Sequence, residues 1–600
     1  GNNVALGREA LMAISSGSSN VAIGRNSLKV LTDGDYNVAL GYATGNALTS
    51  GDDNVLIGRS TAQNLTTGTN NIAIGENALY LENSGTYAIA IGYRAGYKNR
   101  ISSTNYNTFM GYNAGREVST GNHNTFLGNH AGYGVDGSDA DNNVAIGSYS
   151  LVNITGNNNV SIGYEAGRYA SGSSNTFIGY EAGEGGTTSE PFSSGTSNVA
   201  VGYQALKGFT TGYGNTAVGT QALDAVTEGF YNIGVGSAAG GSITTGDYNI
   251  AIGYAAFDAA TTAGSTIAIG YAALSAYTHS ENSFNVAIGT QVAYLKTSGR
   301  FNTYIGGYKV ADADLTGEKN VWIGSYANQY GTDTDSTTLV GYEAGRYATG
   351  SYNTFIGESA GKGGQTSAPY SSGQQNTAVG YKALGVFTTA NYNAAFGMEA
   401  LRVATTGNSN TAVGTFSLYD LNTGTQNVSV GLSSGENITD GNNNVFVGYR
   451  AGYTGTSPDG SIGIGYRALY NNTGDQNIAI GYDAGFALTS GTGNVVIGDR
   501  AGDAMTDNAN NTILGTLAFT GADSGESNNV VIGNSAGGSI NNANSDSNVI
   551  MGYNAGQGGT GELDRCIAIG AYAMDGTGTV SGQQNIFIGD NAGGGSWTTA

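Results

Sequence analysis

A five-residue pattern of one polar and three mostly apolar positions, closed by glycine, recurs along the whole chain. It consists of Asn, then Val, Ile or Thr, an apolar residue, Ile, Leu or Val, and Gly, first at 3–7 and last at 585–589. The chain has 34 copies, most of them 17 residues apart. A short fixed period predicts a stacked, quasi-one-dimensional architecture rather than a globule with a central pocket.

Each motif is predicted to form one short strand. β-branched residues such as Val21, Ile72 and Thr108 dominate the second position, and they favour strands. The second and fourth positions share one face, and the third position faces the other way. The third position is Ala in 16 copies and large and apolar in most others, such as Phe109 and Trp322. A strand that is apolar on both faces is expected to be buried on both faces.

These two apolar faces bear on the oligomeric state. A thin coil encloses only one face of its strand, so the other face needs a partner. The frequent Ala suggests that neighbouring chains approach closely there. We therefore expect a fibre of several chains; the alternative is a wider monomeric coil with a second internal layer.

The remainder of each coil is predicted from small and polar residues. After the motif glycine comes a segment such as 93–96, which we expect to form a second short strand with its third residue inward. A polar turn such as 65–68 then closes the coil. The predicted fold is an all-β parallel β-roll or β-solenoid of about 34 coils, forming a single continuous array over 1–600.

Asn opens 29 of the 34 motifs. Stacked Asn side chains hydrogen-bond along a column of equivalent strands, and Asn also stabilises turns. Because catalysis has no use for so many copies, we interpret these residues as a structural ladder, whose first members are Asn3, Asn20, Asn37, Asn54 and Asn71.

A longer repeat is superimposed on the short one. The stretch 163–202 recurs at 341–380, ten coils further along the chain. We interpret this match as an internal block duplication.

Both copies of the block contain an unusually long coil that carries a proline, from the motif glycine at 179 to that at 202 and from 357 to 380. Pro191 is followed by Phe192, and Pro369 is followed by Tyr370. Loops on a rigid scaffold often carry binding residues, so these four residues are candidates for a binding site. The alternative is a tolerated insertion or a local cover for the fibre surface.

Composition narrows the class of protein further. The net charge is −22, with 22 Lys and Arg in 600 residues, which disfavours nucleic-acid binding. The lone cysteine, Cys566, excludes an intramolecular disulfide. We find neither a signal peptide nor an apolar run long enough for a membrane helix. Because both ends fall within the repeat, we interpret the chain as a section of a longer fibre whose ends lie elsewhere.

The residues with catalytic or metal-binding chemistry do not form a recognised motif. Glycine strings such as 183–186 lack the Lys of a phosphate-binding loop. His123, His130 and His279 are not spaced as metal ligands. Aspartate-bearing turns such as 33–35 are candidates for Ca²⁺, and we expect no other cofactor and no enzymatic activity.

Tyr follows the motif glycine in 14 copies, including Tyr42, Tyr93 and Tyr203. Such a stripe offers ring faces to sugars, or it simply covers the sheet, and we favour the structural role.

The sequence Asn-Val-Ala-Ile-Gly, followed by a short Ala- or Ser-containing segment and Thr-Gly, resembles two related groups of repeats. One is the head repeat of trimeric autotransporter adhesins, which forms a parallel β-roll. The other is the repeat of phage tail fibres and bacterial surface fibre proteins. The resemblance implies a trimer, an extracellular location on a cell or virion, and attachment to a surface, glycan or matrix receptor. The period of this chain, as from Gly7 to Gly24, is longer than that of the adhesin repeat.

The sequence therefore predicts a structural fibre, most simply a parallel homotrimer, that forms a stiff extracellular rod for surface attachment or receptor presentation. One rival is a monomeric solenoid that binds ice, mineral or polysaccharide through regular side-chain rows. A second rival is a glycan-cleaving tailspike, which requires a groove with paired carboxylates.

Overall fold

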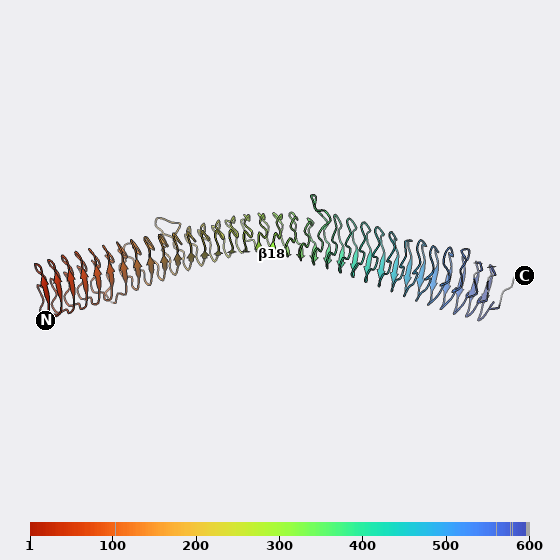
Figure 1. Cartoon of the computed structure of the whole chain (residues 1–600), viewed down its shortest axis with the longest axis horizontal. Helices are drawn as coiled ribbons and strands as arrows, with labels where there is room; N and C mark the ends of the chain where they lie inside the picture. Colours follow the sequence, from red (N-terminus) through yellow and green to blue (C-terminus); the bar gives the residue numbers. More distant parts are fainter. Residues whose placement is uncertain (103, 560, 577, 579, 596–600) are drawn as a thin grey trace. The chain divides into compact units, whose positions relative to one another are not determined.

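The chain is an all-β parallel solenoid of about 34 turns whose spacing follows the motif period, which confirms the predicted fold class at this level. It divides into two compact units, Gly1–Phe301 and Asn302–Ala600. Figure 1 shows that each unit consists of coils stacked one upon the next, with a loop standing off each stack. The computed structural model describes residues 1–102, 104–559, 561–576, 578 and 580–595.

Each motif contributes one strand. The strands of unit 1 are β1 (Val4–Leu6), β2 (Val21–Ile23), β3 (Val38–Leu40), β4 (Val55–Ile57), β5 (Ile72–Ile74), β6 (Ile89–Ile91), β7 (Thr108–Met110), β8 (Thr125–Leu127), β9 (Val144–Ile146), β10 (Val160–Ile162), β11 (Thr176–Ile178), β12 (Val199–Val201), β13 (Thr216–Val218), β14 (Ile233–Val235), β15 (Ile250–Ile252), β16 (Ile267–Ile269) and β17 (Val286–Thr290).

Unit 2 follows the same plan and adds a short two-stranded ladder of β33 and β35. Its strands are β18 (Thr303–Tyr308), β19 (Val321–Ile323), β20 (Thr338–Val340), β21 (Thr354–Ile356), β22 (Thr377–Val379), β23 (Ala394–Phe396), β24 (Thr411–Val413), β25 (Val428–Val430), β26 (Val445–Val447), β27 (Ile462–Ile464), β28 (Ile478–Ile480), β29 (Val495–Ile497), β30 (Thr512–Leu514), β31 (Val530–Ile532), β32 (Val549–Met551), β33 (Leu563–Asp564), β34 (Ile567–Ile569), β35 (Gly582–Gln583) and β36 (Ile586–Ile588).

Within each unit, successive motif strands pair in parallel with equivalent positions opposite one another. Between β2 and β3, Val21 lies opposite Val38 and Ala22 lies opposite Ala39. The same register links β11 to β12 in unit 1 and β21 to β22 in unit 2. Equivalent residues therefore stack in columns along the solenoid.

The third motif position points into the coil. Ala22, Phe109, Phe177 and Trp322 are fully buried there. Our expectation that Ala at this position faces a neighbouring chain is therefore wrong. The close approach is to the opposite wall of the same coil, because the coil bends around the third position and encloses it.

The segment after the motif glycine consists mainly of turns, and the described coils have no separate second strand there. Only β17 and β18 extend past their motif glycines, to Thr290 and Tyr308. In the coil of β6, Arg94 and Gly96 have φ values of 53° and 59° and alternate with residues of ordinary φ. The N–H of Arg94 therefore donates to Glu76 O in the preceding coil, at 2.9 Å. That of Gly96 donates to Ala114 O in the next coil, also at 2.9 Å. The coils remain hydrogen-bonded on this wall without a strand.

The Asn side chains form a hydrogen-bonded column inside the coil. The Asn37 backbone N–H and side-chain amide both donate to Asn20 Oδ1, at 2.9 and 3.0 Å. The same amide donates to Gly51 O at 2.8 Å. Asn54 and Asn71 repeat this geometry, and Asn3 begins it by accepting from Asn20. Each Asn thus joins three coils and satisfies buried backbone groups.

Candidate interaction surfaces

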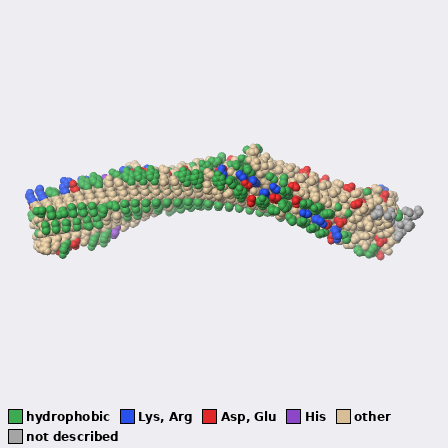
Figure 2. Space-filling model, in the orientation of Figure 1, with side chains coloured by type: hydrophobic (Ala, Val, Ile, Leu, Met, Phe, Trp, Pro, Cys, Tyr) green, Lys and Arg blue, Asp and Glu red, His purple; other side chains and the backbone are tan. Residues whose placement is uncertain are grey.

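The second and fourth motif positions form the outer face of the sheet. Most of their side chains are aliphatic or Thr, and they lie in two adjacent columns because the strands are in register. Ile23, Ile178 and Ile356 are 38%, 37% and 39% exposed, although each stacks on its neighbours. Figure 2 shows rows of hydrophobic side chains along the stacked coils. We refer to these two columns as the outer aliphatic face.

Exposed aromatic residues flank the outer aliphatic face on both sides. Tyr residues that follow the motif glycine, such as Tyr180 and Tyr203, are 44% and 48% exposed. Their ring centroids are 5.3 Å apart and their planes differ by 11°. On the other side, the residue before the motif Asn is often aromatic, as at Tyr231 and Tyr248. Because neighbouring rings cover each other's faces, a stacked Tyr offers mainly its edge and hydroxyl group.

The two proline loops project at equivalent places in the duplicated blocks. Pro191 and Pro369 are exposed, whereas Phe192 and Tyr370 are partly buried. Tyr370 stacks against Tyr330 at 5.6 Å between ring centroids. Phe192 and Pro191 border a surface cavity of about 480 Å³. Tyr370 therefore anchors the second loop, and in both loops the proline is exposed.

The base of each loop is built in the same way in both blocks. Ala170 bridges to Ser193, and Ala348 bridges to Ser371. The hydroxyl oxygens of these serines accept the N–H groups of residues 187 and 365, at 3.2 and 3.3 Å. The sequence duplication thus corresponds to a duplicated loop geometry.

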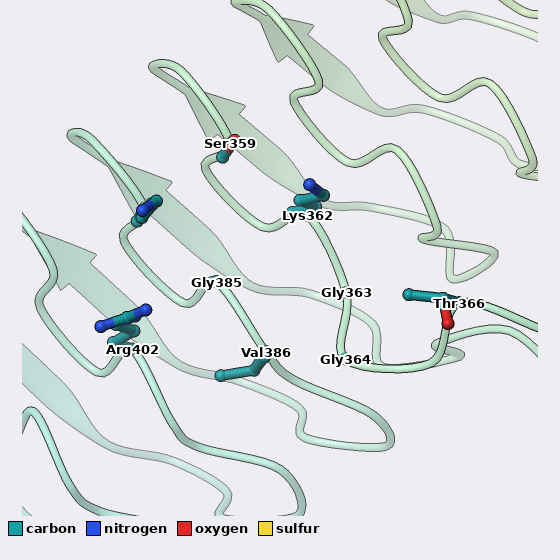
Figure 3. A pocket seen from close by; sticks show the side chains of 9 residues that line it. Ser359, Lys362, Gly363, Gly364, Thr366, Gly385, Val386 and Arg402 are labelled. Carbon is teal, nitrogen blue, oxygen red and sulfur yellow. The ribbon is translucent and has the colours of Figure 1, made fainter.

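A basic pocket beside the second loop was not singled out from the sequence. Lys362, Lys382 and Arg402 border it together with Thr366, and its volume is about 250 Å³ (Figure 3). These cations lie on successive coils, and the closing of each coil brings them together. The signal that was available in the sequence is a cation on each of three successive coils, shortly after the motif glycine.

An ion-pair cluster adjoins this pocket. Glu343 Oε2 accepts from Lys362 Nζ at 2.6 Å, and its other oxygen pairs with Arg346. Burial by itself would raise the pKa of Glu343, but the two cations outweigh burial and hold that pKa below its ordinary value. Glu343 is therefore ionised at neutral pH and fixes the position of Lys362.

The aspartate-bearing turns have a structural use. Asp35 Oδ1 accepts the backbone N–H of Ser18 at 2.6 Å, and Asp52 Oδ1 accepts that of Asp35 at 2.7 Å. Their carboxylates thus join successive coils. In the described part of the chain, His, Cys, Asp and Glu residues do not gather in groups of three or more that would hold a metal ion.

No protein-family model and no curated protein sequence matches this chain. Among the described residues, no helix has the length and apolar character needed to cross a membrane.

Proposed function

We propose that the chain is a segment of an extracellular structural fibre that assembles as a parallel homotrimer and serves surface attachment or receptor presentation. The observation that carries the proposal is the outer aliphatic face. Apolar patches larger than a few hundred Å² mark interaction sites on soluble proteins. A column of aliphatic residues repeated on successive coils presents such a patch in each unit.

A second copy of the same chain fits this face better than an unrelated partner. In a parallel homo-oligomer whose symmetry axis runs along the stack, equal coils lie beside equal coils. Each aliphatic column then packs against the equivalent columns of the neighbouring chains along the whole stack, so the chains need no axial shift relative to one another. The number three and the extracellular location come from the resemblance to adhesin-head and tail-fibre repeats.

Sedimentation of the full chain tests the assembly. We expect a particle of three times the chain mass of 60.7 kDa. Replacing Ile178 and Ile356 with Lys places charges on the outer aliphatic face, so we expect dissociation towards monomer. Lys at Ser16 and Thr423, which are exposed turn residues, provides a control of equal charge. A native monomer, or equal behaviour of the two double variants, would contradict the proposal.

The rival solenoid that binds polysaccharide through its Tyr rows is less well supported. Sugar recognition by aromatic residues uses ring faces, and rings such as Tyr466 and Tyr482 lie 4.8 Å apart with nearly parallel planes. A native monomer that binds unsubstituted polysaccharide would favour this rival. Release of reducing ends from glycans would instead favour the tailspike alternative.

A further inference from the structure

A column of side chains that begins in the second duplicated stretch, 341–380, and continues beyond it has a gap. The fifth residue after the motif glycine is Arg346, Lys362, Gly385 and Arg402 on four successive coils. The three atoms nearest to a Cβ atom added at Gly385 all belong to Lys382 of the same turn, and Lys382 O lies nearest at 3.0 Å. The absent side chain leaves an open slot between Lys362 and Arg402, which are two coils or roughly 10 Å apart.

This slot is the pocket of about 250 Å³ described above. Figure 3 shows Lys362 and Arg402 on different coils, with Thr366 on the neighbouring loop. Lys382 belongs to the same coil as the gap and also borders the pocket. Three cations, two hydroxyl groups and the small residues Gly363 and Gly364 therefore surround one small volume.

The pocket cations keep uncompensated positive charge. Lys362 shares Glu343 with Arg346, and Arg402 Nη1 lies 3.6 Å from Glu399. Within the described residues, Lys382 forms no ion pair, and its Nζ lies 4.8 Å from the ring centroid of Tyr381. Because the whole chain carries a net charge of −22, this concentration of cations is a local feature.

The coils at the end of the first duplicated stretch, 163–202, and just beyond it show what an occupied slot looks like. At the offset that relates the two blocks, Glu184, Gln204 and Asp224 stand where Lys362, Lys382 and Arg402 stand at the end of the second stretch and beyond it. Lys207 replaces Gly385 and pairs with Glu181 and with Glu184, the latter at 3.4 Å. Lys207 is thus neutralised by carboxylates, whereas the equivalent coils after the second stretch carry cations and no side chain in the slot.

We propose that the pocket between Lys362 and Arg402 binds an oxyanion group, namely a sulfate or phosphate that is free or esterified to a glycan. Arg and Lys are the side chains suited to such groups. The volume lies below the usual range for drug-sized ligands, so it suits one charged group with a small attached portion. The proposal stands apart from the assembly through the outer aliphatic face.

Binding of the full chain to immobilised dextran sulfate tests the proposal, with unsubstituted dextran as the neutral probe. We expect binding at low salt, and we expect Lys382→Gln and Arg402→Gln each to weaken it about tenfold. Lys207→Gln is the matched control, because it removes the same charge from the equivalent, already neutralised slot. We expect the affinity of Lys207→Gln for dextran sulfate to stay within about twofold of that of the native protein. Circular dichroism checks that each variant is folded.

Competition with inorganic sulfate and phosphate separates the two sources of the ligand. Displacement at millimolar concentration supports a site for the free ion, and persistence of binding supports an esterified polymer. Absence of binding to all charged probes overturns the proposal. Equal effects of Lys382→Gln, Arg402→Gln and Lys207→Gln overturn it as well, because they would indicate general charge attraction.

Discussion

The ring of Phe177 fills the space that a side chain at Gly183 would need. A Cβ atom added at Gly183 would lie 2.1 Å from Phe177 Cδ1, and the φ of Gly183 is 54°. The next coil has the opposite combination, with Ala200 at the third motif position and Leu206 at the position equivalent to Gly183; both are fully buried. A large residue on one wall of the coil is thus matched by a small residue on the other.

We expect the large and the small residue on the two walls of a coil to be exchangeable as a pair. Phe177→Ala should destabilise by about 3 kcal/mol or more, because it leaves a cavity. Gly183→Leu should also destabilise, because its side chain overlaps the ring. The double variant recreates the Ala and Leu pair of the next coil, so we expect it to recover most of the loss. Urea unfolding followed by circular dichroism measures all three, and additive losses in the double variant would contradict the matched packing.

Replacing one ladder Asn with Asp is expected to make stability depend on pH. The Asn232 amide donates to Gly246 O at 2.8 Å and to Asn215 Oδ1 at 3.1 Å. A carboxylate at this position would face two acceptors in a buried site, so its folded pKa would rise above its unfolded pKa. Asn232→Asp should therefore be tolerated best near pH 4, and its destabilisation should grow to about 3 kcal/mol by pH 7.

Asn408→Asp provides the control for this charge change. Asn408 Oδ1 accepts the N–H of Asn391 at 2.7 Å in a turn, and a carboxylate oxygen accepts equally well. At the equivalent turn position, the carboxylate of Asp35 accepts the backbone N–H of Ser18. We expect thermal melts of Asn408→Asp to follow the native protein from pH 4 to 7. Similar pH profiles for the two variants would argue against the donor role of the ladder amide.

Glu526 is expected to contribute its own pH dependence. Burial raises its pKa to about 6, and its Oε1 has no hydrogen-bond partner among the described residues. The folded pKa lies above the unfolded value, so the stabilising contribution of the protonated form is complete below about pH 4.5. It is lost as the pH rises to about 6. Glu526→Gln should stabilise the protein by about 1 kcal/mol at pH 7 and leave it unchanged at pH 4. Glu228→Gln, a substitution of an exposed glutamate, is the control. It should leave the thermal melting curve unchanged at both pH 4 and pH 7.

The left-handed turn positions are expected to reject β-branched residues. Among the described non-glycine residues of positive φ, none is Val, Ile or Thr. Leu28 has a φ of 47° and is fully buried, whereas Leu31 in the same coil is buried without a positive φ. Both Leu28→Val and Leu31→Val remove one methylene group. We expect Leu28→Val to cost about 1–2 kcal/mol more in urea unfolding, owing to the backbone conformation. Equal costs would contradict this explanation.

The strands and their stacking could be predicted because they depend on short-range patterns. The glycine spacing indicated the coil, and β-branched residues such as Val21 indicated the strand. The segment 93–96 was predicted wrongly, because alternation of small and polar residues is shared by strands and by turns of alternating handedness. The proline loops were located from the coil length alone, but the anchoring of Tyr370 on Tyr330 depends on a loop path that local sequence does not specify.

Periodicity alone determined that the chain is a stacked β-solenoid with apolar side chains on both faces of each strand. Only the tertiary structure decided which face is enclosed. Alternation assigns Ala22 and Ile23 to opposite faces, but the direction in which the coil bends places Ala22 inside and leaves Ile23 outside. Only the tertiary structure also shows that Lys362, Lys382 and Arg402 lie close together, because the closing of the coils brings them to one place. Local sequence sets conformation, whereas the path of the chain between strands sets which side chains meet.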